Sequence, residues 1–181
     1  SPDHHTVQLP NPGADLPGYT AKRSRGFEGF AASVDGETLY PLLEGALWQA
    51  DKNDWERVED GRSALRILEM TAATREWTGN SWLYPLEDDS HAIGDFNMID
   101  ATRGLVIERD GGQGDAELAC AGESTEECFD KPATFKRIYL IDMAGVEPGQ
   151  SINKVAYIDL MDMQDPDGIA RQGKREDARF T

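Results

Sequence analysis

The sequence predicts an all-β protein that forms a portion of a β-propeller, with about two four-stranded antiparallel blades. Short apolar runs separated by turn signals begin at Gly26 and continue to residue 163. The second half of this region repeats the pattern of the first, with the longest insertion of each unit between its second and third strands. Repeated four-stranded sheets with variable loops are typical of propeller blades, and a β-sandwich of the same strands is the alternative.

The first blade is predicted between residues 26 and 88. The runs GFEGFAAS and TLYPLLE are joined by VDGE, whose Asp-Gly pair is a strong hairpin signal. An acidic loop, DKNDWERVEDGRS, precedes the runs ALRILEMT and REWTGNSWLYPLE. ALRILEMT contains good helix formers, but its counterpart in the second half is β-like, so we predict a strand there.

The second blade is predicted between residues 92 and 163. IGDFNMID and RGLVIERD form its hairpin, and FKRIYLIDM and INKVAYIDLMDM are its third and fourth strands. Residues 1–24 are predicted to be an extended arm, and residues 164–181 a polar connector toward a further blade. Because a propeller needs about four blades to close, we expect partners: the remaining blades, from a second chain or a cleaved part of the same polypeptide.

The composition limits the cellular compartment and the classes of partner that we expect for this protein. The net charge of −16 argues against nucleic acids and anionic membranes as partners. No apolar run approaches the roughly 18 residues of a membrane-spanning helix. Cys120 and Cys128 lie in a polar, Gly-containing loop, and we favour a short-range disulfide over two free thiols. A disulfide implies an oxidising compartment, so the predicted location is periplasmic or secreted.

Acidic residues recur near the ends of the predicted strands. The repeat places Glu28 and Asp95 at matching positions of the inner strands, and the second hairpin ends with Glu108 and Asp110. Converging carboxylates repel one another unless a cation neutralises them, and calcium accepts irregular sets of oxygen ligands. These four acids are therefore the predicted calcium ligands, with solvated strand ends as the alternative. Arg109 is expected to pair with one of them or with an anionic substrate.

Three stretches together resemble the phytase-like domain family, which is described by the esterase-like activity of phytase. They are RGFEGFAASVDGETLYPLLEGAL, IGDFNMIDATRGLVIERD and FKRIYLIDMAG, and they span residues 25 to 160. Family members have G-F-E-G-L-A, a D-G-x-x-L-Y hairpin and an L-V-x-E-R-D strand, and Phe30 replaces the usual Leu here. The resemblance implies a β-propeller, export, and a relationship to calcium-dependent phosphate-ester hydrolysis.

From this resemblance we expect an exported, calcium-dependent phosphoric-ester hydrolase. Glu28 and Glu108 are the expected catalytic residues, and calcium would lower the pKa of the attacking water. Arg25 and Arg109 are the expected substrate-binding residues. The alternatives are a non-enzymatic, calcium-stabilised propeller module for binding or scaffolding, and a metal-dependent esterase or lactonase. No G-x-S-x-G elbow and no P-loop occurs in the sequence.

Overall fold

The computed structural model describes residues 20–22, 24–114, 116–123, 125 and 128–163. Most of the predicted arm and the whole predicted connector therefore lie outside the described residues. Within the described chain the regular structure consists of β-strands and two short 3-10 helices, Ala116–Leu118 and Leu160–Asp162, without an α-helix. The all-β prediction is confirmed. None of the helices in the described chain is long and apolar enough to cross a membrane.

The first sheet is an antiparallel meander of four strands in the order β1-β2-β5-β6. Its strands are β1 (Phe27–Ala32), β2 (Thr38–Leu43), β5 (Ala64–Thr71) and β6 (Glu76–Pro85). The predicted Asp-Gly turn joins β1 to β2: Asp35 accepts a hydrogen bond from the backbone N–H of Glu37, and Gly36 adopts φ +75°. A left-handed conformation of this kind costs glycine little, which is why Asp-Gly marks hairpins.

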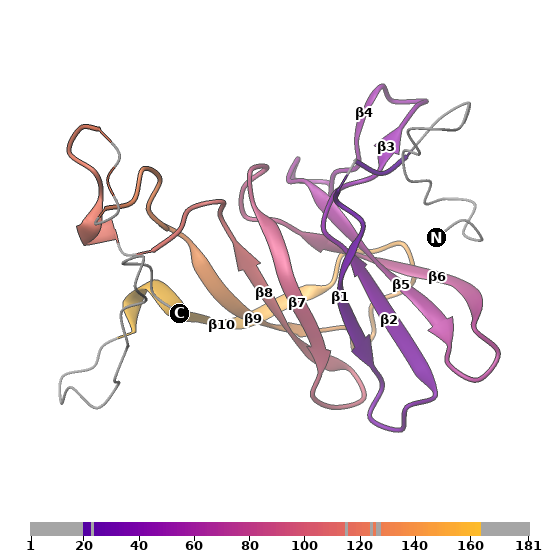
Figure 1. Cartoon of the computed structure of the whole chain (residues 1–181). Helices are drawn as coiled ribbons and strands as arrows, with labels where there is room; N and C mark the ends of the chain where they lie inside the picture. Colours follow the sequence, from indigo (N-terminus) through magenta and orange to yellow (C-terminus); the bar gives the residue numbers. More distant parts are fainter. Residues whose placement is uncertain (1–19, 23, 115, 124, 126–127, 164–181) are drawn as a thin grey trace.

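The second sheet repeats this meander in the order β10-β9-β8-β7. Its strands are β7 (Ala92–Met98), β8 (Arg103–Arg109), β9 (Lys136–Asp142) and β10 (Asn153–Asp159). An additional hairpin, β3 (Trp48–Gln49) and β4 (Asp54–Trp55), lies in the insertion of the first unit and was not predicted. The eight predicted strands and their grouping into two antiparallel sheets are confirmed, as expected of two propeller blades (Figure 1).

Both sheets carry a β-bulge at the same point of their first hairpin. The register passes from Phe27↔Leu43 to Gly29↔Leu42 in the first sheet, and from Ile93↔Glu108 to Asp95↔Ile107 in the second. Superposing the bulges makes Gly29 the counterpart of Asp95. The prediction that Glu28 and Asp95 occupy matching positions is therefore wrong by one residue. Such a shift turns a side chain to the opposite face of its sheet.

The two sheets share one apolar core. Its largest buried side chains from the first sheet are Leu42, Leu65, Ile67, Trp82 and Tyr84, and those from the second are Ile93, Phe96, Val106, Tyr139 and Ile141. At one edge the inner strands β1 and β7 lie against each other. At the other edge Leu83 exchanges backbone hydrogen bonds with Gln150 and Ile152, at 3.0 and 2.9 Å. The relative placement of the sheets is therefore held at both edges.

Gly29 allows β1 to approach β7 closely. A Cβ atom at this position would lie 2.8 Å from Cβ of Phe96 and 3.2 Å from Cβ of Leu42, both fully buried. Because neither neighbour can move aside easily, Gly29→Ala is expected to lower the free energy of unfolding by about 1–3 kcal/mol in urea denaturation. Gly122→Ala, with no atom within 4 Å of the new methyl group, is the control. Equal stability of the two variants would mean that β1 and β7 do not pack in this way in solution.

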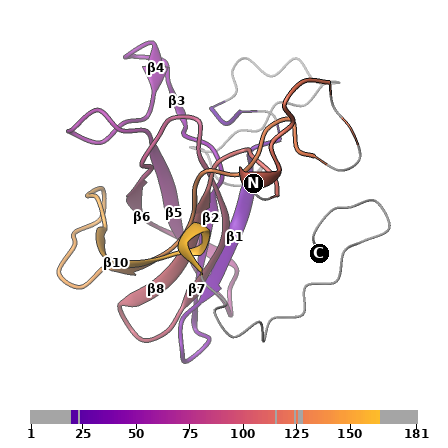
Figure 2. The same cartoon turned by 90° about the vertical axis from the view of Figure 1, so that its left-hand side faces the viewer.

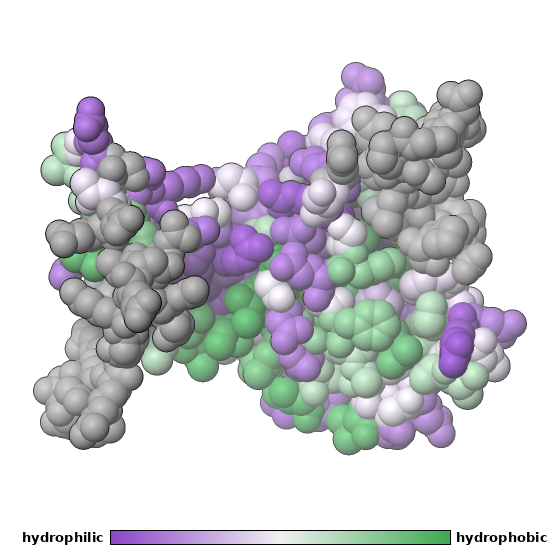
Figure 3. All heavy atoms as spheres, viewed as in Figure 1, coloured by the Kyte–Doolittle hydropathy of each residue, from purple (hydrophilic) through white to green (hydrophobic). Residues whose placement is uncertain are grey.

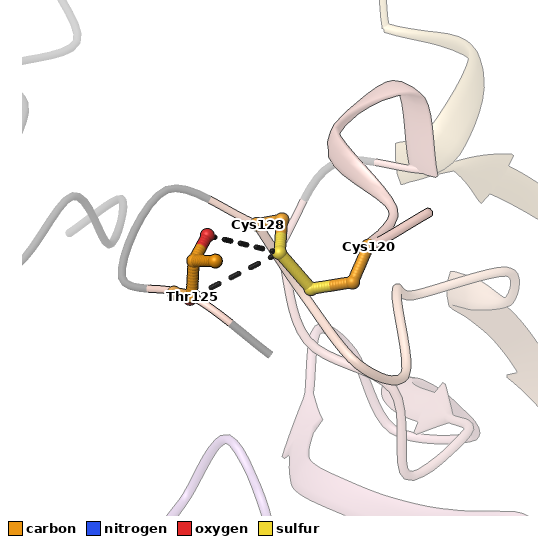
Figure 4. Close-up of a disulfide and its surroundings, with 3 residues drawn as sticks. All are labelled: Cys120, Thr125 and Cys128. Carbon is orange, nitrogen blue, oxygen red and sulfur yellow. Dashed lines mark hydrogen bonds between the residues drawn. A yellow bond between two sulfur atoms is a disulfide. The ribbon is translucent and has the colours of Figure 1, made fainter. Parts of the chain in front are cut away.

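The long insertions of both units rise from the same end of the sheets. Figures 1 and 2 show the β3–β4 hairpin and the segment between β8 and β9 above the end at which β1 begins and β2 finishes. The second insertion contains the disulfide between Cys120 and Cys128, with an S–S distance of 1.96 Å, so the predicted pairing is confirmed (Figure 4). A disulfide is compatible with a periplasmic or secreted protein.

Candidate functional site

Four charged side chains gather at the end of the sheets from which the insertions rise: Arg25, Glu28, Glu44 and Arg109. We call them the carboxylate–arginine cluster. Nη2 of Arg109 lies 3.7 Å from Oε1 of Glu28 and also 3.7 Å from Oε1 of Glu44. Nη1 of Arg25 lies 3.9 Å from the same oxygen of Glu44. At these separations the contacts are electrostatic rather than hydrogen bonds, so the guanidinium donors can still bind an anion.

The two carboxylates of the cluster meet because of the first hairpin. Its register pairs Phe27 with Leu43. Glu28 and Glu44, which follow these two residues, therefore both lie near the end of the sheet at which β1 begins and β2 finishes. Glu28 is the additional residue of the β-bulge. A bulge commonly redirects one side chain, and here it accompanies the approach of the two acids.

Glycines leave space for both arginines. A Cβ atom at Gly45 would lie 2.8 Å from Cβ of Arg25, so any larger residue would displace that side chain. A Cβ atom at Gly94 would lie 4.0 Å from Nε of Arg109. Arg109 therefore extends across the inner strand β7 at a position that has no side chain, and in this way it reaches the acids of the first sheet.

The environment of Glu44 favours its protonated form. Its side chain is only 13% exposed, whereas that of Glu28 is 37% exposed. Burial raises the pKa of Glu44 above its ordinary value, and the charge of Glu28 and a hydrogen bond with it raise it further, against the opposing charges of Arg25 and Arg109. Glu44 is therefore easier to protonate than an exposed glutamate. When Glu44 is protonated, the two arginine charges exceed the charge of Glu28, and the cluster carries a net positive charge that attracts anions.

Glu108 is not part of this cluster, although it is adjacent to Arg109 in the sequence. Successive residues of a strand point to opposite faces, so Glu108 points between the two sheets, where it is fully buried. Its carboxylate accepts four hydrogen bonds: from the Tyr84 hydroxyl (2.9 Å), the Glu87 backbone N–H (2.8 Å), His91 Nδ1 (2.9 Å) and Lys154 Nζ (2.7 Å). This geometry leaves no lone pair for substrate or calcium, and it gives Glu108 a structural role.

Asp110 and Asp95 are also engaged locally. Asp110 accepts hydrogen bonds from Lys136 Nζ (2.7 Å) and from the backbone N–H and hydroxyl of Thr134 (2.8 Å each). It therefore anchors both ends of the insertion between β8 and β9. Asp95 accepts hydrogen bonds from the backbone N–H of Phe96 (2.8 Å) and from Nδ2 of Asn97 (2.9 Å), and it is exposed.

The four predicted calcium ligands do not converge on one point. Glu28 belongs to the cluster, Glu108 lies between the sheets, and Asp110 lies in its own hydrogen-bond network. In the described parts of the chain no group of three or more His, Cys, Asp or Glu side chains is placed to hold a metal ion. In the described chain the four acids therefore do not form one common site, and the binding of calcium stays a prediction.

Sequence analysis identified Arg25, Glu28 and Arg109, which the structure brings together, but it missed Glu44. Counting outward from the Asp-Gly turn pairs Glu28 with Leu43 and Phe27 with Glu44, which would place the two acids on opposite faces of the hairpin. The β-bulge, which shifts the phase of β1, was not visible in the alternation of apolar residues.

The hydrogen bonds to Asp110 have a consequence for stability. Burial alone would raise the pKa of Asp110, but the hydrogen bonds from Lys136 and Thr134 outweigh it and hold the pKa well below its usual range. A carboxylate with a depressed pKa stabilises the folded state above its unfolded pKa of about 4, and this contribution is lost as the pH falls through the folded pKa.

Asp110→Asn is accordingly expected to lower the free energy of unfolding by about 2 kcal/mol at pH 7, because it removes charge-assisted hydrogen bonds. The difference from the unmodified protein should shrink as the pH falls below about 4. Urea denaturation at several pH values measures both effects. Asp130→Asn, an exposed position in the same insertion, is the control. A difference that stays constant down to acidic pH would contradict the proposed origin of the stabilisation.

Comparison with known proteins gives one family. The family model described as "Phytase-like: Esterase-like activity of phytase" matches residues 4–174 of the chain. No curated protein and no solved structure gives a significant match. The matched range contains both sheets and every residue of the carboxylate–arginine cluster.

Proposed function

Because this chain belongs to the phytase-like family, we propose that it is an exported phosphoric-ester hydrolase whose carboxylate–arginine cluster binds the substrate phosphate. The observation that carries the proposal is the pair Glu28 and Glu44 between two arginines at one end of the sheets. Two carboxyl groups of unequal burial provide an acid and a base. Two guanidinium groups provide the donors that a phosphate requires.

In the proposed reaction Arg25 and Arg109 each donate hydrogen bonds to phosphoryl oxygens and offset the charge that develops on them. A water molecule attacks phosphorus and gives its proton to the Glu28 carboxylate. The ester P–O bond breaks, and protonated Glu44 gives its proton to the departing alcohol oxygen. Transfer of the proton from Glu28 to the neighbouring Glu44 then restores the starting state.

Calcium remains in the proposal as the cofactor that the family resemblance implies. Glu28 and Glu44 are the acids that the cluster could offer it, and the neighbouring arginines oppose a cation there. Further oxygen ligands would come from the blades that complete the ring, supplied by a second chain or another part of the polypeptide. When bound, calcium would offset the negative charge of the substrate.

Export is supported by the disulfide between Cys120 and Cys128, because disulfides persist in oxidising compartments. The acidic composition adds a requirement. With a net charge of −16 the protein as a whole repels polyanions, so binding of a phosphate ester depends on local positive charge. The cluster, once Glu44 is protonated, provides such a local charge.

The proposal is tested by measuring phosphate release from an aryl phosphate and from phytate, with calcium and after EDTA treatment. We expect release with calcium, and a loss of at least tenfold when Arg109 is replaced by Ala, because the phosphate then loses a bidentate donor. Arg103→Ala, an exposed arginine at the opposite end of β8, is the matched control.

Three results would contradict parts of this proposal. Hydrolysis of an aryl acetate without hydrolysis of the aryl phosphate would identify a carboxylesterase. Absence of both activities, together with a melting temperature that rises with calcium, would identify a binding or scaffold module. Phosphate release that survives EDTA would remove calcium from the proposal and leave the roles of the cluster intact.

A further inference from the structure

The second sheet has one face on which apolar side chains are partly or largely exposed in the described chain. Strand pairing places four side chains in a row across this face: Asp95, Ile107, Ile138 and Ile158. Ile158 is 60% exposed, and Leu105 in the next row is 37% exposed. Figure 3 shows hydrophobic side chains gathered over β8 and β9. Contiguous apolar surface of this kind marks an interaction site. We call it the free face of the second sheet.

The first sheet uses its corresponding row for packing. With the two bulges superposed, the counterparts of the row above are Gly29, Leu42, Ile67 and Trp82. Leu42 and Ile67 are fully buried and Trp82 is 8% exposed, all within the core shared with the second sheet. The second sheet therefore presents to solvent the positions through which the first sheet binds its neighbour.

The complementary surface is also present in the same chain. The second sheet packs on the first through Phe96, Val106 and Tyr139, and their row ends at Tyr157, which is 55% exposed. Its counterparts in the first sheet, Phe30, Pro41, Leu68 and Ser81, lie on the side turned away from the second sheet. Two of these residues, Pro41 and Leu68, are already buried within the chain, Leu68 together with Ala21 and Leu47. Phe30 remains 53% exposed.

The charges agree with this arrangement. Superposing the bulges makes Glu44 the counterpart of Arg109. Each of them directly follows the residue of the second strand that pairs with the strand residue just before the bulge. Within the chain, Glu44 of the first sheet lies 3.7 Å from Arg109 of the second. Consider a first sheet from another copy that packs on the free face with the same geometry. At that new contact Arg109 would occupy the position that Glu44 occupies within the chain, and it would face Glu44 of the added copy. Opposite charges would again face each other.

From these three observations we propose that the free face of the second sheet binds a second copy of this chain, through the side of the first sheet that carries Phe30. The contact joins two different surfaces, so repeated copies must close into a ring or grow without limit. About two to four copies would supply the four to eight sheets of a propeller. At each contact, Glu44 of one copy would lie near Arg109 of the next copy. The inference rests on packing and charge and does not depend on the hydrolase proposal.

The test is the mass of the full chain in solution, measured by light scattering over a range of concentrations. We expect an integer multiple, above one, of the 20.0 kDa chain mass. Ile158→Lys and Phe30→Lys, each on a different partner surface, should each reduce the mass to that of one chain. Val34→Lys, at a 72% exposed apolar position in the β1–β2 turn, is the matched control and should assemble normally. Circular dichroism establishes that every variant is folded.

Mixing the two disrupted variants makes the test specific for a contact between unlike surfaces. Ile158→Lys retains an intact first sheet and Phe30→Lys retains an intact free face, so the mixture should form a pair of twice the chain mass and grow no further. Assembly of Phe30→Lys alone would overturn the proposal, because it would show that like surfaces meet. A single-chain mass for the unmodified protein at every concentration would also overturn it, and would assign the free face to another polypeptide.

Discussion

Replacing Glu108 by Gln is expected to lower the free energy of unfolding by about 3 kcal/mol, the largest stability effect we predict. The carboxylate is fully buried and accepts hydrogen bonds from Tyr84 on β6, from His91 just before β7 and from Lys154 on β10. The neutral amide removes the negative charge that compensates Lys154. Its NH₂ group also faces neighbours that all act as hydrogen-bond donors to the carboxylate. Lys154 keeps its second partner, Glu87 at 2.8 Å, which limits the loss.

Urea denaturation at pH 7 measures this effect, and Glu59→Gln at an exposed position is the control. The double variant Glu108→Gln, Lys154→Met should lose less than the sum of the two single variants, because the two charges stabilise each other. Additive losses would show that the pair contributes no coupling energy. In that case the attachment of β8 to β10 would rest on packing alone.

Glu44→Gln is expected to reduce kcat for phosphate-ester hydrolysis by about 10²–10³-fold, the largest effect on activity that we predict. In the proposed reaction Glu44 protonates the leaving alcohol, and Gln has no proton to give. Glu37→Gln, which changes an exposed acid just before the other end of β2, should leave kcat unchanged.

The pH profile tests the role of Glu44 separately from its contribution to folding. A general acid is active while protonated, so kcat should fall as the pH rises through the pKa of Glu44, which burial and Glu28 raise above the ordinary value. The Glu44→Gln variant should lose this descending limb. A variant with lowered kcat and an unchanged limb would show that Glu44 only positions the cluster, and another group would then be the acid.

Local sequence features predicted most of the fold because they have local physical causes. Strand alternation and the Asp-Gly turn at residues 35–36 act over a few residues, and eight strands were identified from such signals. The hairpin of β3 and β4 escaped prediction because two-residue strands are too short to show a period. The short, polar cysteine loop was sufficient to predict the disulfide, since ring closure over such a distance costs little.

The direction of each acidic side chain was decided by tertiary structure. Nothing in the sequence E-R-D distinguishes the roles of Glu108, Arg109 and Asp110. Because of the strand pleat and the bulge, the Glu108 side chain lies between the sheets and the Arg109 side chain lies in the cluster. A one-residue change of phase reverses such assignments, and apolar alternation does not report where a bulge falls. By itself the sequence determined the all-β repeat, the disulfide and three members of the cluster. Only the packing of one sheet on the other decided that Glu44 completes the cluster and that Glu108 and Asp110 stabilise the fold, because burial and strand register are properties of the assembled sheets.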